Sequence, residues 1–119
     1  MEKSLSKILI VDDEPAICWA FRESLTDEGY SVDIAGTAEQ ALTMSDLKQP
    51  DVIVMDLNMP KLNGVDATRE IREKPGAPKV VILSMYDGEE YVRPAIRAGA
   101  SGYLLKGSGL SDLVSAIRA

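Results

Sequence analysis

Three short apolar runs constrain the fold of this chain more than any other feature of its sequence. They lie at residues 7–11 (KILIV), 52–55 (VIVM) and 80–83 (VVIL). Runs of this length without alternating polar residues are typical of strands covered on both faces, as in a parallel sheet. Weaker segments of the same kind lie at 31–35 and 102–105.

A segment with helical signals follows each predicted strand. Pro15 suits a first helical turn, and Ile17, Phe21 and Leu25 fall on one face that we expect to pack in the core. Thr37 opens a Thr-Ala-Glu-Gln capping box at the start of the second helix. The predicted helices cover approximately residues 15–28, 37–49, 64–72, 87–98 and 110–119.

This alternation predicts an α/β fold: a doubly wound five-stranded parallel sheet with five helices, in one domain of residues 1–119. Right-handed crossovers place the helices on both faces of such a sheet. Pro94 lies inside the fourth predicted helix, where it removes a backbone hydrogen bond. We therefore expect this helix to be short or kinked.

The composition narrows the function classes. Lys and Arg number 13 against 19 Asp and Glu, and the net charge of -6 argues against nucleic-acid binding by this domain itself. No segment approaches the ~20 apolar residues of a membrane span, so we expect no membrane partner and a cytoplasmic location. Cys18 is the only cysteine and there is no histidine, which excludes an intramolecular disulfide and a transition-metal cluster.

Polar side chains close four of the predicted strands. The first strand ends in Asp12-Asp13, the third in Asp56, the fourth in Ser84 and the fifth in Lys106. Ligands of open α/β sheets bind at the carboxyl ends of the strands, near the point where the strand order reverses. If the order is 2-1-3-4-5, the three aspartates converge at that point.

These residue types suit phosphoryl transfer. Clustered carboxylates repel one another and attract a divalent cation, and Mg²⁺ prefers one or two carboxylates with waters and a phosphate oxygen. A lysine and a serine hydroxyl are further donors to a phosphoryl group, and an aspartate is a nucleophile that forms an acyl phosphate. Each residue alone has an ordinary explanation, such as a helix N-cap for the acidic pair. Their joint placement favours a site.

Four motifs, in order along the chain, resemble the receiver domain of bacterial two-component response regulators. They lie at 8–15 (ILIVDDEP), 56–60 (DLNMP) with Asn63-Gly64, 81–84 (VILS) and 98–106 (AGASGYLLK). The resemblance covers essentially the whole chain. It implies a flavodoxin-like fold with the strand order 2-1-3-4-5.

The resemblance implies a phosphorylation site. Asp56 is the implied phosphoacceptor, and a sensor histidine kinase is the implied donor. The implied cofactor is Mg²⁺, bound by Asp13, Asp56 and the main-chain carbonyl of Asn58, with Asp12 contributing through water. The domain would then assist its own phosphorylation and dephosphorylation rather than act as an enzyme on a separate substrate.

The resemblance also implies a switch. Ser84 would hydrogen-bond a phosphoryl oxygen, Lys106 would pair with it, and Tyr103 would turn inward when Ser84 moves. Gly107 stands where many receivers have a proline with a cis bond. The bond after Lys106 therefore stays open between cis and trans, as does how firmly the lysine is held before phosphorylation.

Two stretches, 83–87 (LSMYD) and 102–106 (GYLLK), are most similar to receivers that precede a LuxR-type helix-turn-helix. This likeness implies control of transcription through a phosphorylation-dependent homodimer, with DNA bound by an output domain that this chain does not include. Trp19 lies opposite the predicted core face of the first helix. An exposed tryptophan there is either a contact surface for a kinase or a second subunit, or a harmless exposure.

Three alternatives stay open. A phosphatase or mutase of the haloacid-dehalogenase type also uses an aspartyl phosphate, but its nucleophile lies in an Asp-x-Asp motif after the first strand. A flavodoxin-like flavin carrier needs a phosphate-binding loop where this chain has Asp12-Asp13-Glu14. A degenerate receiver that takes no phosphate is disfavoured, because every catalytic position is filled.

Overall fold

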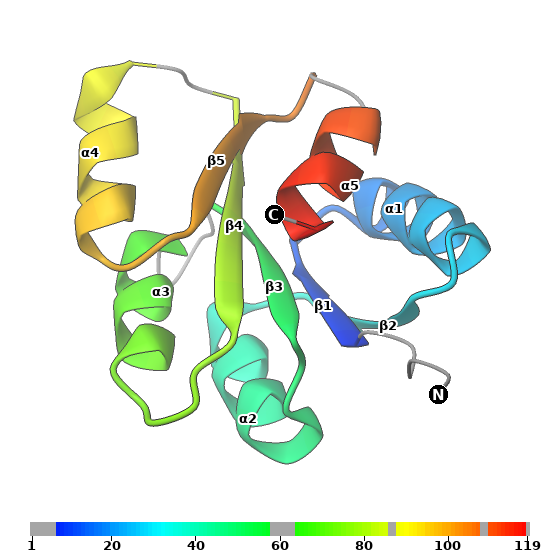
Figure 1. Cartoon of the computed structure of the whole chain (residues 1–119), viewed down its shortest axis with the longest axis horizontal. Coiled ribbons are helices and arrows are strands. Elements are labelled where there is room, and N and C mark those ends of the chain that lie inside the picture. The colour runs from blue at the N-terminus through cyan, green and yellow to red at the C-terminus, as the bar shows by residue number, and fades with distance from the viewer. Residues whose placement is uncertain (1–6, 58–63, 86–87, 108–109, 119) are drawn as a thin grey trace.

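Strands and helices alternate along the whole of the described chain (Figure 1). The computed structural model describes residues 7–57, 64–85, 88–107 and 110–118. The elements are β1 (Lys7–Val11), α1 (Pro15–Asp27), β2 (Ser31–Ala35), α2 (Ala38–Lys48), β3 (Val52–Asp56), α3 (Gly64–Arg72), β4 (Lys79–Ser84), α4 (Glu89–Arg97), β5 (Gly102–Leu105) and α5 (Leu110–Arg118).

The strands form one parallel sheet in the order β2-β1-β3-β4-β5. This confirms the predicted doubly wound fold and its strand order. Since β1 and β3 are neighbours at the point where the order reverses, Val11 pairs with Met55 and the residues that follow meet at one edge. No helix among the described residues is long and apolar enough to cross a membrane.

Both faces of the sheet are covered, as the unbroken apolar runs predict. Ile8 and Ile10 pack in one cluster with residues of α1 and α5, whereas Leu9 and Val11 pack in a second cluster with residues of α2, α3 and α4 (Figure 1). Successive side chains of a strand point to opposite faces, so the apolar residues of these runs are buried on both faces of the sheet. Each fully buried large apolar side chain contributes about 1.5–3 kcal/mol.

The core face of α1 differs from the predicted one by one position. Cys18 and Leu25 are buried and the half-buried Phe21 packs against the same cluster, whereas Ile17, also half-buried, packs against neither core cluster. The prediction that Ile17 faces the core is therefore wrong. Spacings of three and four residues both fit a helix face, so periodicity alone does not separate Ile17 from its neighbour Cys18.

The start of α2 follows its predicted cap with one change. The Oγ1 of Thr37 accepts a hydrogen bond from the backbone N of Gln40 at 3.1 Å, as expected of an N-cap. The Oε1 of Gln40 accepts from the backbone N of Gly36 at 2.8 Å. The reciprocal bond of the capping box therefore reaches one residue further back than usual.

The fourth helix is short, as expected, but it is no shorter than α3 or α5 and it continues past Pro94. It spans nine residues, Glu89–Arg97, with Pro94 inside it and exposed. Since proline has no N–H, the carbonyl of Glu90 lacks its helical partner, and we expect Pro94→Ala to stabilise the protein by about 2 kcal/mol. Urea denaturation measures this gain. Arg93→Ala is the control, because it removes only the exposed ion pair with Glu89; an unchanged Pro94→Ala midpoint would show that α4 already accommodates the proline.

One buried hydroxyl in α3 lacks a partner within the described residues. Thr68 is fully buried, and its Oγ1 makes no hydrogen bond there. Valine has nearly the same shape and a similar helix propensity, so we expect Thr68→Val to stabilise the protein by about 1 kcal/mol. Thr43→Val, at an exposed position of α2, is the control and should change little. A destabilised Thr68→Val would mean that the hydroxyl is satisfied by water.

Candidate functional site

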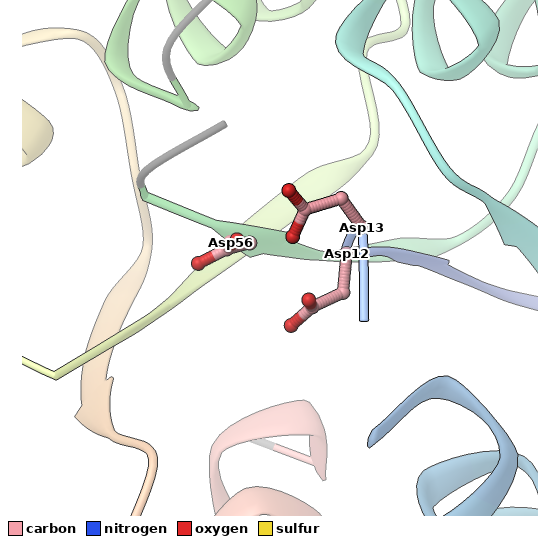
Figure 2. Close-up of side chains that lie close together, drawn as sticks. All are labelled: Asp12, Asp13 and Asp56. Atoms are coloured by element: carbon pink, nitrogen blue, oxygen red, sulfur yellow. The ribbon is translucent and has the colours of Figure 1, made fainter. Parts of the chain in front are cut away.

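Three carboxylates meet at the carboxyl edge of the sheet, beside the reversal of strand order. Asp12 and Asp13 directly follow β1, and Asp56 is the last residue of β3. One carboxylate oxygen from each of the three lies within 4.8 Å of those of the other two, and Figure 2 shows the side chains gathered around the ends of the two strands. The predicted convergence of the three aspartates is confirmed.

Backbone contacts fix the position of Asp12. Its N–H donates to the carbonyl of Ala35 at 3.1 Å, which extends the pairing of β1 with β2 by one residue. Its Oδ1 accepts from the backbone N of Glu14 at 3.0 Å, and its carbonyl accepts from the Sγ of Cys18 at 3.3 Å. Burial, with the nearby charges of Asp12 and Asp13, raises the pKa of the Cys18 thiol. Asp12 is buried, whereas Asp13 is exposed.

Lys106 reaches the acidic cluster from the end of β5. Its Nζ lies 3.2 Å from Asp12 Oδ2, 3.2 Å from Asp56 Oδ1 and 3.5 Å from Glu14 Oε1. Burial alone lowers the pKa of Lys106, but hydrogen bonding and charge from Asp12, followed by Asp56, outweigh it, so the pKa is raised. The ammonium is therefore protonated and partly neutralises the cluster.

The bond after Lys106 is trans, like the other peptide bonds among the described residues. This decides between the cis and trans forms that Gly107 left open. The lysine is held firmly, with a side chain only 12% exposed, and its backbone N donates to the carbonyl of Ser84 at 2.8 Å. Three carboxylates therefore hold the ammonium of Lys106 in the absence of a proline at position 107.

Ser84 and Tyr103, the two predicted switch residues, lie on the neighbouring strands β4 and β5. Ser84 closes β4, is buried, and pairs with Leu105 in the sheet. Tyr103 pairs with Ile82, is half-buried, and packs against the cluster beneath α2, α3 and α4. Asn58, whose main-chain carbonyl is a predicted metal ligand, lies outside the described residues.

Two residues of the site had no predicted role. Glu14 is a third carboxylate partner of Lys106, and the acidic run Asp12-Asp13-Glu14 was the signal in the sequence. Cys18 bonds the Asp12 carbonyl, which no sequence pattern indicates.

The donor set fits a hard divalent cation. Asp12, Asp13 and Asp56 each offer a carboxylate oxygen, and Mg²⁺ prefers oxygen ligands. The Oδ2 of Asp12 is buried, and its contact among the described residues is the ion pair with Lys106 Nζ at 3.2 Å. A buried carboxylate oxygen in that situation has ligand capacity to spare.

Comparison with known proteins identifies the family. The sequence model of the response regulator receiver domain matches residues 8–118. The chain belongs to this family. A receiver domain is a signalling domain, and the family match decides against the phosphatase and flavin-carrier alternatives.

Solved receiver domains share the fold and much of the sequence. A two-component response regulator of the LuxR family from Aurantimonas sp. SI85-9A1 superposes with a TM-score of 0.89 at 38% identity, over 97% of this chain and 84% of that one. A CheY-like receiver domain protein from Methanospirillum hungatei JF-1 gives 0.89 at 31% identity, over 97% and 92%. The predicted likeness to receivers of the LuxR family is confirmed.

Curated relatives are about twice as long. The receiver domain is 38% identical over 122 residues to the uncharacterised transcriptional regulatory protein YxjL of Bacillus subtilis (strain 168). The match covers 100% of this chain and 56% of that protein. The chain thus spans about half the length of the curated relatives it matches.

Proposed function

We propose that Asp56 accepts a phosphoryl group and that the receiver domain signals through the resulting acyl phosphate. A carboxylate oxygen of Asp56 attacks the phosphorus of the donor, a P–O bond to Asp56 forms, and the donor's bond to phosphorus breaks with its electron pair leaving on the donor. The observation that carries the proposal is the buried Asp56 with the Lys106 ammonium 3.2 Å from its Oδ1. A preorganised cation there stabilises the charge that develops on the phosphoryl oxygens.

The other site residues act on the phosphoryl group. Ser84 donates a hydrogen bond to one of its oxygens, and Lys106 pairs with another. Asp13, Asp56 and the main-chain carbonyl of Asn58 would hold Mg²⁺, with Asp12 acting through water. When bound, the ion supplies Lewis-acid neutralisation of the phosphoryl charge. The same groups assist dephosphorylation.

Intact mass tests the reaction. The parent protein, incubated with acetyl phosphate and Mg²⁺, is expected to gain the mass of one phosphoryl group, and chelation of Mg²⁺ is expected to suppress the gain. No gain under any donor concentration would contradict the proposal.

A sensor histidine kinase is the proposed donor, and transcription is the proposed output. Support comes from the family match and from relatives named as transcriptional regulators that are about twice as long. DNA binding is assigned to an output domain outside this chain, consistent with its net charge of -6. A cytoplasmic location, where kinase and DNA are both accessible, belongs to the same proposal.

Phosphorylation changes the surface formed by α4, β5 and α5, and this surface controls dimerisation and output. Phosphorylation draws Ser84 inward and Tyr103 fills the vacated space, which shifts the population between two packings. Met85, Ile96 and Leu105 are exposed apolar residues on or beside β5 and α4 that a second copy can cover. Sedimentation with and without beryllofluoride tests this: a larger mass with beryllofluoride supports dimerisation, and an unchanged mass with an unchanged amide spectrum counts against the switch.

Trp19 offers a contact surface on α1, for a kinase or a second subunit. Its side chain is 65% exposed, as predicted. If a kinase docks here, Trp19→Ala should slow transfer from the kinase about tenfold, since buried aromatic anchors dominate interfaces, and leave phosphorylation by acetyl phosphate unchanged. Leu47→Ala, at an exposed position of α2, is the control. Normal kinase transfer and normal assembly of Trp19→Ala would remove this surface.

A further inference from the structure

The first residue of α3 lies directly against the end of β3. The N–H of Gly64 donates to the carbonyl of Leu57 at 2.7 Å, and the N–H of Leu57 donates to the carbonyl of Leu83 at 3.0 Å. Leu57 is therefore held through both of its backbone polar groups, on one side by β4 and on the other by α3. Asp56 is the residue immediately before it.

The approach of α3 leaves no room for a side chain at position 64. A Cβ built on Gly64 would overlap the carbonyl oxygen of Asp56, and it would lie 2.9 Å from the Cα of Leu57 and 3.1 Å from the carbonyl carbon of Asp56. All three atoms belong to the backbone. No change of rotamer can relieve the overlap, so either the end of β3 or the start of α3 must move.

Space, not backbone conformation, requires glycine here. Gly29, Gly76 and Gly99 have positive φ angles, whereas Gly64 does not. Gly64 is the first residue of α3, and the nearest atoms that a Cβ there would meet belong to Asp56 and Leu57.

We propose that Gly64 is a positioning residue of the phosphorylation site. By letting α3 lie against the end of β3, it keeps the Asp56 carboxylate close to Asp12, Asp13 and Lys106. The inference rests on the proposed function of Asp56. Both elements resist movement, since β3 is paired on both sides and α3 buries Ala67 and Ile71 in the core. A displacement of the Asp56 backbone moves its carboxylate.

The contacts of the Asp56 carboxylate leave little room for displacement. Lys106 Nζ lies 3.2 Å from an oxygen of Asp56 and 3.2 Å from an oxygen of Asp12. Misplacement of a reacting group by about 1 Å costs up to roughly 100-fold in rate. Since the three carboxylates also form the proposed Mg²⁺ site, the same displacement should weaken binding of the ion in the absence of any phosphoryl donor.

The experiment compares Gly64→Ala with the parent in two assays at a temperature where circular dichroism shows both folded. One assay is the rate of phosphorylation by acetyl phosphate, followed by intact mass, and the other is the Mg²⁺ dissociation constant from calorimetry without a donor. We expect a rate at least tenfold lower and Mg²⁺ binding at least threefold weaker. Gly102→Ala is the matched control, because its Cβ would meet only the methyl groups of Val81 at 3.9 Å.

A second control separates positioning from stability. Ile71→Val destabilises the same helix by about 1 kcal/mol without adding an atom near Asp56, and it should retain the rate and the Mg²⁺ affinity of the parent within twofold. Gly64→Ala is also made in the Thr68→Val background. A folded Gly64→Ala with parental rate and affinity overturns the proposal, as does a chain unfolded in both backgrounds, since Gly64 would then serve the fold rather than the site.

The two proposals fail differently. If the parent takes no phosphate but Gly64→Ala still weakens Mg²⁺ binding, the phosphoacceptor role of Asp56 is wrong while Gly64 still positions the carboxylates. If the parent is phosphorylated and Gly64→Ala matches it in both assays, only the role of Gly64 is wrong.

Discussion

Asp56→Asn is expected to abolish phosphorylation of the domain while leaving it folded. Asparagine keeps the shape of the side chain but removes the anionic nucleophile, so we expect the rate with acetyl phosphate to fall by roughly three orders of magnitude or more. The substitution also takes one of three neighbouring negative charges out of the cluster, and Lys106 keeps its contacts with Asp12 and Glu14. Stability without Mg²⁺ should therefore stay near that of the parent.

The measurement is intact mass against time, on the parent and on the variant. Asp51→Asn is the matched control, since it makes the same change beside the opposite end of β3, where an asparagine oxygen can still accept the hydrogen bond from the backbone N of Lys7. Borohydride reduction followed by peptide mapping locates the acyl phosphate in the parent. A variant that gains phosphoryl mass at the parental rate would show that another residue is the acceptor.

The residue pattern predicts the sheet well because the apolar residues of the three central strands, β1, β3 and β4, are buried on both faces. The predicted segments at 7–11, 31–35 and 102–105 coincide with β1, β2 and β5. The bounds of β3 and β4 differ from the predicted segments 52–55 and 80–83, since Asp56 completes β3 and the polar residues Lys79 and Ser84 complete β4. A strand end defined by polar residues is also where a site forms, so the same pattern located Asp56, Ser84 and Lys106.

Contacts between distant segments were beyond the reach of the sequence. The burial of Cys18 in place of Ile17 depends on how α1 is rotated against the sheet, which a period of 3.6 residues does not define. The pairing of Glu14 with Lys106 and the close approach of Gly64 to Asp56 join residues that are not neighbours in the sequence. Such contacts are set by packing, whereas the strand ends are set by local pattern.

Lys106→Met is expected to destabilise the domain without Mg²⁺ and to slow phosphorylation. Methionine has a similar length but no charge, so the buried carboxylates of Asp12 and Asp56 lose their ammonium partner. Breaking a buried ion pair from one side costs about 3–5 kcal/mol, because an uncompensated charge remains. Urea denaturation in a chelator measures this loss. Lys74→Met is the control, since its pair with Asp46 is exposed and contributes at most about 1 kcal/mol.

The stabilisation from Lys106 has a defined pH dependence. Its pKa is raised in the folded protein, chiefly by Asp12 and then Asp56 against the opposing effect of burial. The folded state therefore holds the proton of Lys106 more tightly than the unfolded chain does, in which lysines titrate at about pH 10.4. The contribution of Lys106 is fully present below that pH and is lost as the pH rises through the folded pKa. The gap in stability between parent and Lys106→Met should narrow in that alkaline window.

Measurements with Mg²⁺ separate the role of Lys106 in stability from its role in phosphoryl transfer, because Lys106→Met is expected to raise the affinity for Mg²⁺ and to lower the rate of phosphorylation. The ammonium of Lys106 and Mg²⁺ are attracted to the same carboxylates. Removal of the ammonium should therefore tighten Mg²⁺ binding, and bound Mg²⁺ should restore part of the lost stability. Phosphorylation should nevertheless slow by roughly 100-fold at saturating Mg²⁺, because one oxygen of the transferred phosphoryl group loses its cationic partner. Lys106 would be a structural counter-ion only, with no part in transfer, if the variant bound Mg²⁺ more tightly and was phosphorylated at the parental rate.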